Sequence, residues 1–70
     1  MDGTDLLNRK VVDSLTGRNL QVTLFDGRSL VGHLYVVDLG ISSVTLSLED
    51  NGVLTTHRFP VSMIRNVQTR

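Results

Sequence analysis

The sequence predicts a small, mostly β domain, in which an N-terminal helix precedes a strongly bent, five-stranded antiparallel barrel. Three observations lead to this fold class. Apolar residues first recur at helical spacing, and from Asn19 onward they recur at every second position. Pairs of Asp or Asn with Gly divide the second part into short segments, as in turn-linked strands. With only 70 residues, we expect a single domain over residues 1–70.

The first segment, residues 4–15, has the pattern of an amphipathic helix. Thr4 can cap its N-terminus through the side-chain hydroxyl. The apolar residues of its stripe, with Val12 beside them, are Leu7, Val11 and Leu15. Gly17 follows at the position where many helices end in the left-handed conformation. We therefore expect a helix that packs on a surface and ends before Gly17.

Five strands are expected between residues 19 and 68. Their approximate ranges are 19–25, 29–37, 42–49, 53–59 and 63–68. Asp26-Gly27 and the segment 50–52 have the composition of tight hairpin turns. Pro60 separates the last two strands, since proline interrupts a β ladder.

The second strand is long, apolar on both faces, and interrupted by Gly32. A five-stranded sheet of this size closes only if a long strand bends, and an interior glycine makes bending least costly. We expect Gly32 to mark the bend and the strand to belong to both halves of the barrel. Asp38, at the end of this strand, is expected to accept backbone N–H groups and brace the following loop.

Composition excludes several ways of stabilising so small a domain. Folding hides only about 60% of the surface of a chain of this size, so the core is marginal. There is no cysteine, hence no disulfide or thiolate metal site, and neither His33 nor His57 has metal-ligand spacing. No cofactor is expected. Oligomerisation is the remaining means of stabilisation.

Charge and hydropathy limit the function classes. Lys plus Arg and Asp plus Glu each number 7, so no global field attracts nucleic acid or anionic lipid. No apolar run approaches the ~18 residues that cross a membrane, and the N-terminus is acidic, unlike a signal peptide. We expect a cytoplasmic protein without a membrane partner. No nucleophile with a base and no carboxylate pair is present, so we do not expect an enzyme.

The order and spacing of these residues resemble the Sm and Sm-like (LSm) family, which includes bacterial Hfq. The first motif is represented by "VTL", "DGR", Gly32-x-Leu34-x-x-x-Asp38 and "SVTL", and the second, more loosely, by "FPVSMIRNV". The resemblance implies a bent barrel capped by the helix. It also implies a ring of about six or seven subunits, in which the fourth strand of one subunit pairs with the fifth of the next. Family members mostly bind single-stranded RNA, often uridine-rich, around the inner face of the ring.

The resemblance also indicates which positions correspond to the family's RNA pocket. The position that stacks on a base falls on Gly40 or Ile41, and the asparagine position falls on Ser42 or Ser43. The Arg-Gly pair of the second motif is replaced by Pro60 and Val61. These side chains cannot stack a base or read a base edge as the family's residues do, which implies an altered base preference.

Further residues are candidates with two open interpretations each. Arg58 is the best candidate for a phosphate contact, or else a solvated charge on an edge strand. Tyr35, on the same face as His33, Val31 and Val37, either stacks a base or covers a sheet face or subunit contact. Arg28 either reaches a functional face or is a solvated turn residue. The basic side chains of the helix region, which either contact phosphate or form an ordinary polar face, are Arg9, Lys10 and Arg18.

The leading hypothesis is an Sm-like ring that binds single-stranded RNA with altered base preference. Two alternatives remain open. One is a homo-oligomeric interaction scaffold of the same fold that has lost the uridine pocket. The other is a subunit of a mixed Sm-like ring.

Overall fold

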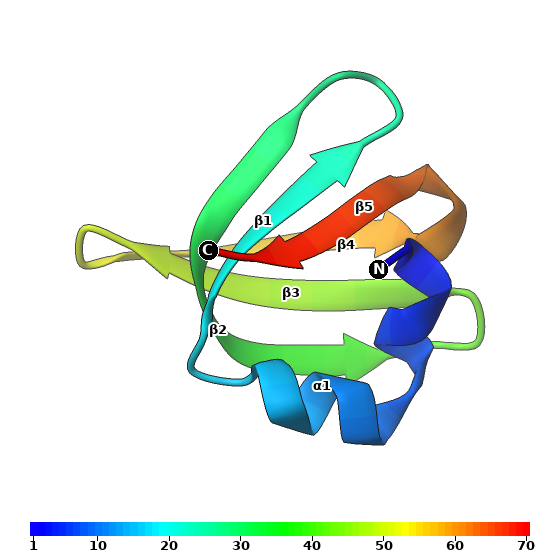
Figure 1. Cartoon of the computed structure of the whole chain (residues 1–70), viewed down its shortest axis with the longest axis horizontal. Helices are drawn as coiled ribbons and strands as arrows, with labels where there is room; N and C mark the ends of the chain where they lie inside the picture. Colours follow the sequence, from blue (N-terminus) through cyan, green and yellow to red (C-terminus); the bar gives the residue numbers. More distant parts are fainter.

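The computed structural model describes residues 1–70 and contains two short helical segments, five strands and a helical turn (Figure 1). In chain order these are the 3-10 helix η1 (Gly3–Leu7), α1 (Arg9–Leu15), β1 (Asn19–Leu24), β2 (Ser29–Leu39), β3 (Ser43–Asp50), β4 (Val53–Pro60), the 3-10 turn η2 (Val61–Met63) and β5 (Ile64–Thr69). The predicted number and order of the strands are confirmed. No helix is long and apolar enough to cross a membrane.

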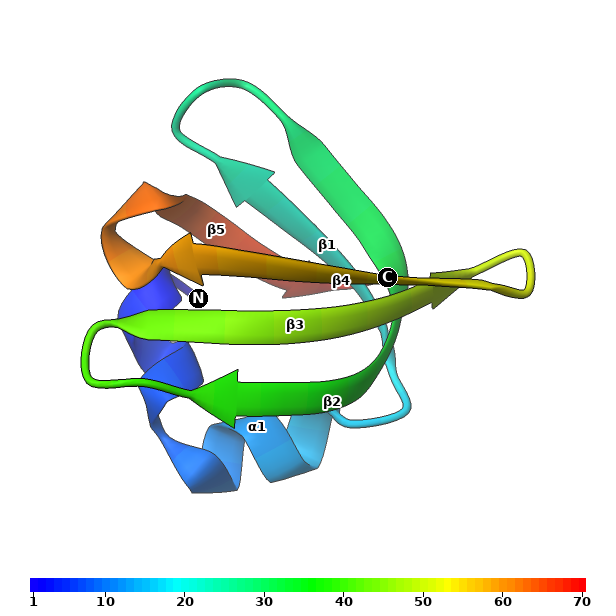
Figure 2. The ribbon, with the colours of Figure 1, turned by 180° about the vertical axis from the view of Figure 1, so that it is seen from behind.

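The five strands form one antiparallel sheet in the order β4-β3-β2-β1-β5. The sheet is strongly bent at β2, so that its two halves face each other across the core (Figures 1 and 2). It is not closed: β4 pairs only with β3, and β5 only with β1. The predicted strongly bent, five-stranded antiparallel sheet is confirmed, but its closure into a barrel is wrong for the single chain, because both end strands use just one edge for pairing.

Strand β2 belongs to both halves of the sheet, as predicted. His33 is paired with Asn19 of β1 and with Glu49 of β3. The residues of β2 before it pair with β1, and those after it pair with β3. The adjacent Gly32 lies against β3: a Cβ there would stand 2.8 Å from the carbonyl oxygen of Glu49. Glycine thus permits the close approach of two backbones at the bend. The strand ends at Leu39, two residues beyond the predicted end at Val37.

A β-bulge follows the bend. The register of β2 against β3 shifts between Leu34 and Val36, which leaves Tyr35 as the extra residue. Leu34 and Val37 are consequently both buried although they are three residues apart, whereas Tyr35 and Val36 are exposed. The prediction that Val37 shares a face with His33 and Tyr35 is wrong, because the bulge reverses the alternation.

The predicted single helix over residues 4–15 is divided at Asn8. Asp2, not Thr4, caps the first segment: its Oδ1 accepts the backbone N–H of Thr4 at 3.0 Å, within a capping box with Asp5. Asn8 then caps α1 by accepting the backbone N–H of Lys10 at 3.0 Å. Two side-chain caps in seven positions make a second helix start more favourable than one continuous helix.

This division also changes which apolar residues are buried. Leu6, Val12 and Leu15 are buried, while the predicted Leu7 and Val11 are only partly buried against the core. Gly17 has a φ of +83° and ends the helical region, as predicted. Its N–H donates to the carbonyl of Leu34 at 2.6 Å, which attaches the end of α1 to β2.

One hydrophobic core of 14 buried side chains joins η1, α1 and all five strands. Val44, Leu46 and Leu48 alternate along β3 and are all buried. Strand β4 contributes only Phe59 to this core, so most of β4 is exposed. The predicted β3–β4 turn is confirmed, with φ of 53° at Asn51 and 80° at Gly52.

Candidate functional site

A hollow of about 180 Å³ lies where the β2–β3 loop meets the end of β4. This loop is at the left of Figure 2, beside the arrowhead of β4. The lining residues come from three consecutive strands and the loop, and are Asp38, Leu39, Gly40, Ser43, Thr45 and Arg58. Only Leu39 among them is hydrophobic, so the hollow is a polar site.

Three of these side chains form a row across the sheet. Asp38 of β2 is paired with Thr45 of β3, and Thr45 is paired with Arg58 of β4. Directly opposite residues of neighbouring strands project to the same face, so the three side chains are neighbours on that face. Because Val44 and Leu46 face the core, the row lies on the opposite, outer face of the sheet.

The polar side chains that line the hollow have no partners within the chain. The structure has one ion pair, between Arg28 and Asp26, and neither Asp38 nor Arg58 takes part in one. No side-chain hydrogen bond involves the carboxylate of Asp38, the guanidinium of Arg58, or the hydroxyls that line the hollow. A carboxylate, a guanidinium and two hydroxyl groups are therefore available to a ligand.

The backbone, and not Asp38, braces the loop after β2. The N–H of Gly40 donates to the carbonyl of Ser43 at 2.8 Å, and the N–H of Val61 donates to the carbonyl of Ser42 at 2.9 Å. The prediction that Asp38 accepts backbone N–H groups is thus wrong, and its carboxylate is free. A Cβ at Gly40 would lie 2.7 Å from Oγ of Ser43, so glycine leaves room at the edge of the hollow.

The structure brings together most of the residues that the sequence singled out. Gly40, Ser43 and Arg58 line the hollow. Ile41 and Ser42 are exposed in the same loop, and Pro60 is paired with Ser43. Two lining residues, Thr45 and Leu39, were missed. Alternation in "SVTL" places Thr45 on the outer face, but which residues lie beside it depends on the strand register.

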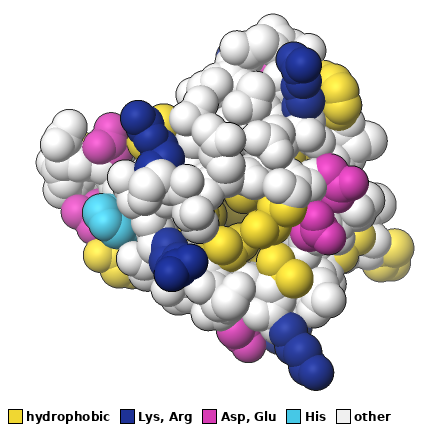
Figure 3. Space-filling view, viewed as in Figure 1, with side chains coloured by type: hydrophobic (Ala, Val, Ile, Leu, Met, Phe, Trp, Pro, Cys, Tyr) yellow, Lys and Arg dark blue, Asp and Glu magenta, His cyan; other side chains and the backbone are white.

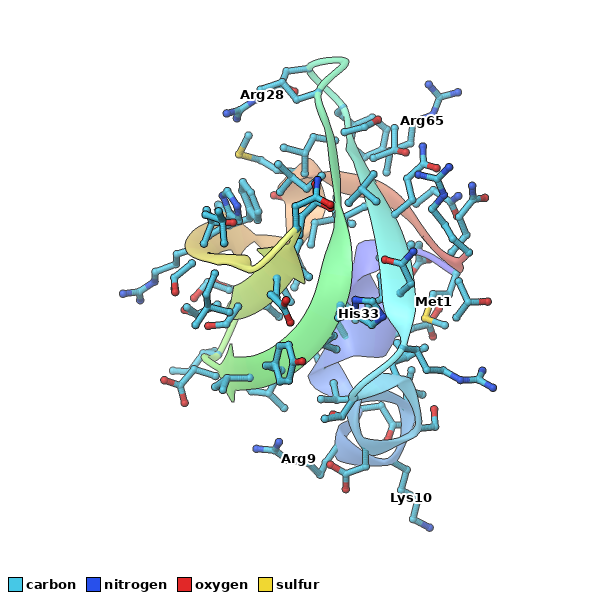
Figure 4. All side chains as sticks on the ribbon, turned by 90° about the vertical axis from the view of Figure 1, so that its left-hand side faces the viewer. Met1, Arg9, Lys10, Arg28, His33 and Arg65 are labelled. Atoms are coloured by element: carbon cyan, nitrogen blue, oxygen red, sulfur yellow. The ribbon has the colours of Figure 1, made fainter.

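Arg28 does not belong to this site. It lies at the tip of the β1–β2 hairpin, away from the rest of the sheet (Figure 4). Its Nε donates to Oδ2 of Asp26 at 2.7 Å, and its backbone N–H donates to Oδ1 at 3.0 Å. These bonds hold the pKa of the Asp26 carboxyl below its ordinary value. Gly27 has a φ of +94°, so the segment is the predicted hairpin turn.

Tyr35 lies apart from the hollow, on the outer face beside the bend. Hydrogen bonding to the Glu49 carboxylate, together with the negative charge of that group, raises the pKa of the Tyr35 hydroxyl. His33 is the residue directly opposite Glu49. Tyr35 does not line the hollow and does not extend the row across Asp38.

Positive charge is spread over the molecule. Arg9 and Lys10 project from α1 at one end, and Arg28 and Arg65 from the opposite end (Figure 4). On the face shown in Figure 3, Lys and Arg side chains stand apart from one another, around a central patch of hydrophobic atoms. No group of three His, Cys, Asp or Glu residues could hold a metal ion. Arg58 is the one positively charged side chain that lines the hollow, and it does not belong to a larger basic patch.

No family model matches the chain, and no curated protein matches it either.

Proposed function

We propose that the chain is an Sm-like protein of the cytoplasm that assembles into a homo-oligomeric ring and binds single-stranded RNA with an altered base preference. The observation that carries this proposal is the hollow beside the β2–β3 loop. Two of its lining residues, Gly40 and Ser43, stand at positions that the motif resemblance assigns to an RNA pocket, and its charged side chains form no ion pair within the chain. No catalytic role is proposed for it.

Ring assembly is supported by the two open edges of the sheet. Strands β4 and β5 each have one unpaired edge, and unpaired edges associate with other strands unless they are blocked. Joining the β4 edge of one subunit to the β5 edge of the next is a heterologous contact, and such contacts form a ring when the rotation between successive subunits closes. Burial of the exposed β4 would add to a core that is small for an independent domain.

Strand addition at β4 can be tested with a matched pair of lysine variants. Leu54, 59% exposed on the edge strand, and Val36, 57% exposed on the interior strand β2, bear similar apolar side chains on the same outer face. We expect Leu54→Lys to reduce the ring mass in native mass spectrometry, because edge lysines oppose strand pairing. Val36→Lys should leave the mass unchanged. A wild-type protein that stays monomeric at high concentration would contradict the ring.

RNA binding is supported by the chemistry of the hollow. Arg58 supplies a guanidinium without an intramolecular partner, and Ser43 and Thr45 supply hydroxyls that donate or accept. Leu39, the only hydrophobic residue of the lining, packs against the core, and no aromatic ring lines the hollow. Recognition of a base would therefore depend on hydrogen bonds at its edge more than on stacking, which differs from the family's pocket.

Fluorescence anisotropy with a labelled single-stranded RNA tests this binding. We expect Arg58→Ala to weaken affinity and Arg28→Ala, which removes the same charge from a residue paired with Asp26, to have little effect. Affinity should fall with salt, as for any ligand that carries phosphates. Absence of binding even at low salt would contradict the proposal.

The second candidate function is that of a ring-forming scaffold without RNA. It is favoured by the spread of basic residues and by the carboxylate of Asp38, which would repel a phosphate in the hollow. A ring whose mass and stability do not change when RNA is added would favour the scaffold.

A further inference from the structure

The size of the hollow limits what can occupy it. Sites for drug-sized molecules measure about 300–1,000 Å³, and this hollow, at about 180 Å³, is smaller. It can hold one planar group of nucleobase size, with the remainder of a nucleotide outside. Gly40 keeps one side open, because a Cβ there would approach Oγ of Ser43.

Two opposite charges face the hollow without neutralising each other. Asp38 and Arg58 are separated by the intervening strand β3, hence by two strand spacings, or roughly 10 Å between backbones. They form no ion pair, although both line the same hollow. A planar ligand that donates at one end and accepts at the other could therefore lie between them, over Thr45.

The two charged groups differ in what they require from a ligand. A carboxylate accepts through two oxygens, and is best satisfied by two adjacent donors. A guanidinium offers a fork of donors, which is best satisfied by two adjacent acceptors. Guanine alone among the RNA bases presents both: N1–H and the exocyclic N2 amine are neighbouring donors, and O6 and N7 are neighbouring acceptors.

Uracil fits the same groups poorly. Its single N3–H donor lies between the carbonyl oxygens O2 and O4. A carboxylate that accepts this proton would hold its second oxygen against a carbonyl, which is repulsive. Adenine and cytosine each offer one amino donor group beside a ring nitrogen acceptor, so one oxygen of Asp38 would be left without a donor.

We infer that this hollow binds a guanine base of single-stranded RNA, with Asp38 accepting from N1–H and the N2 amine and Arg58 donating to O6 and N7. The inference rests on the proposed function and names the base preference of the same site.

The test compares three labelled heptamers by anisotropy: uridine throughout, and the same sequence with guanosine or inosine at the centre. We expect the guanosine heptamer to bind about tenfold more tightly than the uridine heptamer, as a bidentate base contact would require. Inosine lacks the N2 amine and should lose a large part of this preference, because one carboxylate oxygen then has no donor.

Two conservative variants separate base reading from phosphate binding. Asp38→Asn replaces one acceptor by a donor, and should bring the guanosine-to-uridine affinity ratio to about one. Arg58→Lys keeps the charge but loses the fork, and should also reduce that ratio. If Arg58 contacts phosphate instead, Arg58→Lys will leave the ratio intact, which would overturn its assigned role. Circular dichroism of both variants checks that the fold is retained.

The possible failures are distinguishable. Equal affinity for the guanosine and uridine heptamers would overturn the guanine inference and leave RNA binding standing. No binding of any heptamer would overturn both. Competition by free guanosine monophosphate as strong as that by the unlabelled guanosine heptamer would overturn RNA as the source of the base.

Discussion

Substituting Gly32 by alanine tests whether the bend of β2 depends on close approach of two backbones. The added Cβ would lie 2.8 Å from the carbonyl oxygen of Glu49 and 3.1 Å from Cβ of Leu48. The first contact is with backbone, so relief requires the strands to separate. Gly32 is not among the residues with positive φ, and alanine is therefore compatible with the local conformation.

The magnitude of the effect follows from two opposing contributions. Overpacking in a well-packed site costs about 1–3 kcal/mol. Replacing glycine by alanine also restricts the unfolded chain, which stabilises by about 0.4–1 kcal/mol. We expect a net loss of about 1–2 kcal/mol in the free energy of unfolding, and a melting temperature lower by about 4–8 °C per kcal/mol. Gly32→Val should lose more than Gly32→Ala, because its side chain is larger.

Urea denaturation followed by circular dichroism provides the measurement, with the free energy of unfolding taken by linear extrapolation. All variants must be compared at one protein concentration, because assembly would contribute to stability. Gly40→Ala is the matched control: its nearest contact, at 2.7 Å, is with the Ser43 hydroxyl, which can rotate away. A Gly32→Ala variant as stable as the wild type, or no less stable than Gly40→Ala, would refute the account of the bend.

Three further predictions concern the core and the turns. Leu46→Ala should lower the free energy of unfolding by about 2–5 kcal/mol, because Leu46 is fully buried, whereas Val36→Ala, at an exposed position away from the sheet edges, should change it by less than about 0.5 kcal/mol in urea titrations. The NMR-measured pKa of Asp26 should lie below 3.8 and should rise, but only in part, in Arg28→Ala, which keeps the backbone N–H donor. The stabilisation that this carboxylate contributes is present above pH 3.8 and is lost as pH falls through the native pKa. The free energies of unfolding of the wild type and Asp26→Asn should therefore converge in acid. A difference between the two that does not change with pH would argue against the hydrogen bonds of Asp26 in the turn. Gly52 has a φ of 80°, so Gly52→Ala should lower the free energy of unfolding by about 1–2 kcal/mol. Gly52→Asn should lower it by less, because asparagine tolerates the left-handed conformation. Equal melting temperatures for the two variants would contradict this explanation.

The strands and turns were predictable from sequence because their causes are local. Alternating Val44, Leu46 and Leu48 mark a half-buried strand whatever lies opposite, and all three are buried. Gly17 and Gly52 adopt positive φ because no other residue type does so as readily. These preferences depend on a few neighbouring residues.

The errors of prediction arose where two local preferences compete or where a distant partner intervenes. Thr4, Asp2 and Asn8 are all good capping residues, and their order in the sequence does not say which of them caps. The bulge at Tyr35 exists because β2 must pair with β3 beyond the bend while Leu34 and Val37 both reach the core. Periodicity within one strand contains no information on such a requirement.

The candidate site shows the same division. Motif resemblance indicated Gly40 and Ser43 from spacing along the chain, Arg58 was a separate candidate for a phosphate contact, and the three line one hollow. That Asp38 stands free, in a row with Thr45 and Arg58, follows from the register of three strands, which is set by packing of the core on their other face. Local side-chain chemistry specifies where strands and turns occur. The position of one strand beside another depends on burial and pairing between residues that are distant in sequence. This non-local requirement brings Asp38 and Arg58, which are twenty residues apart, to one site.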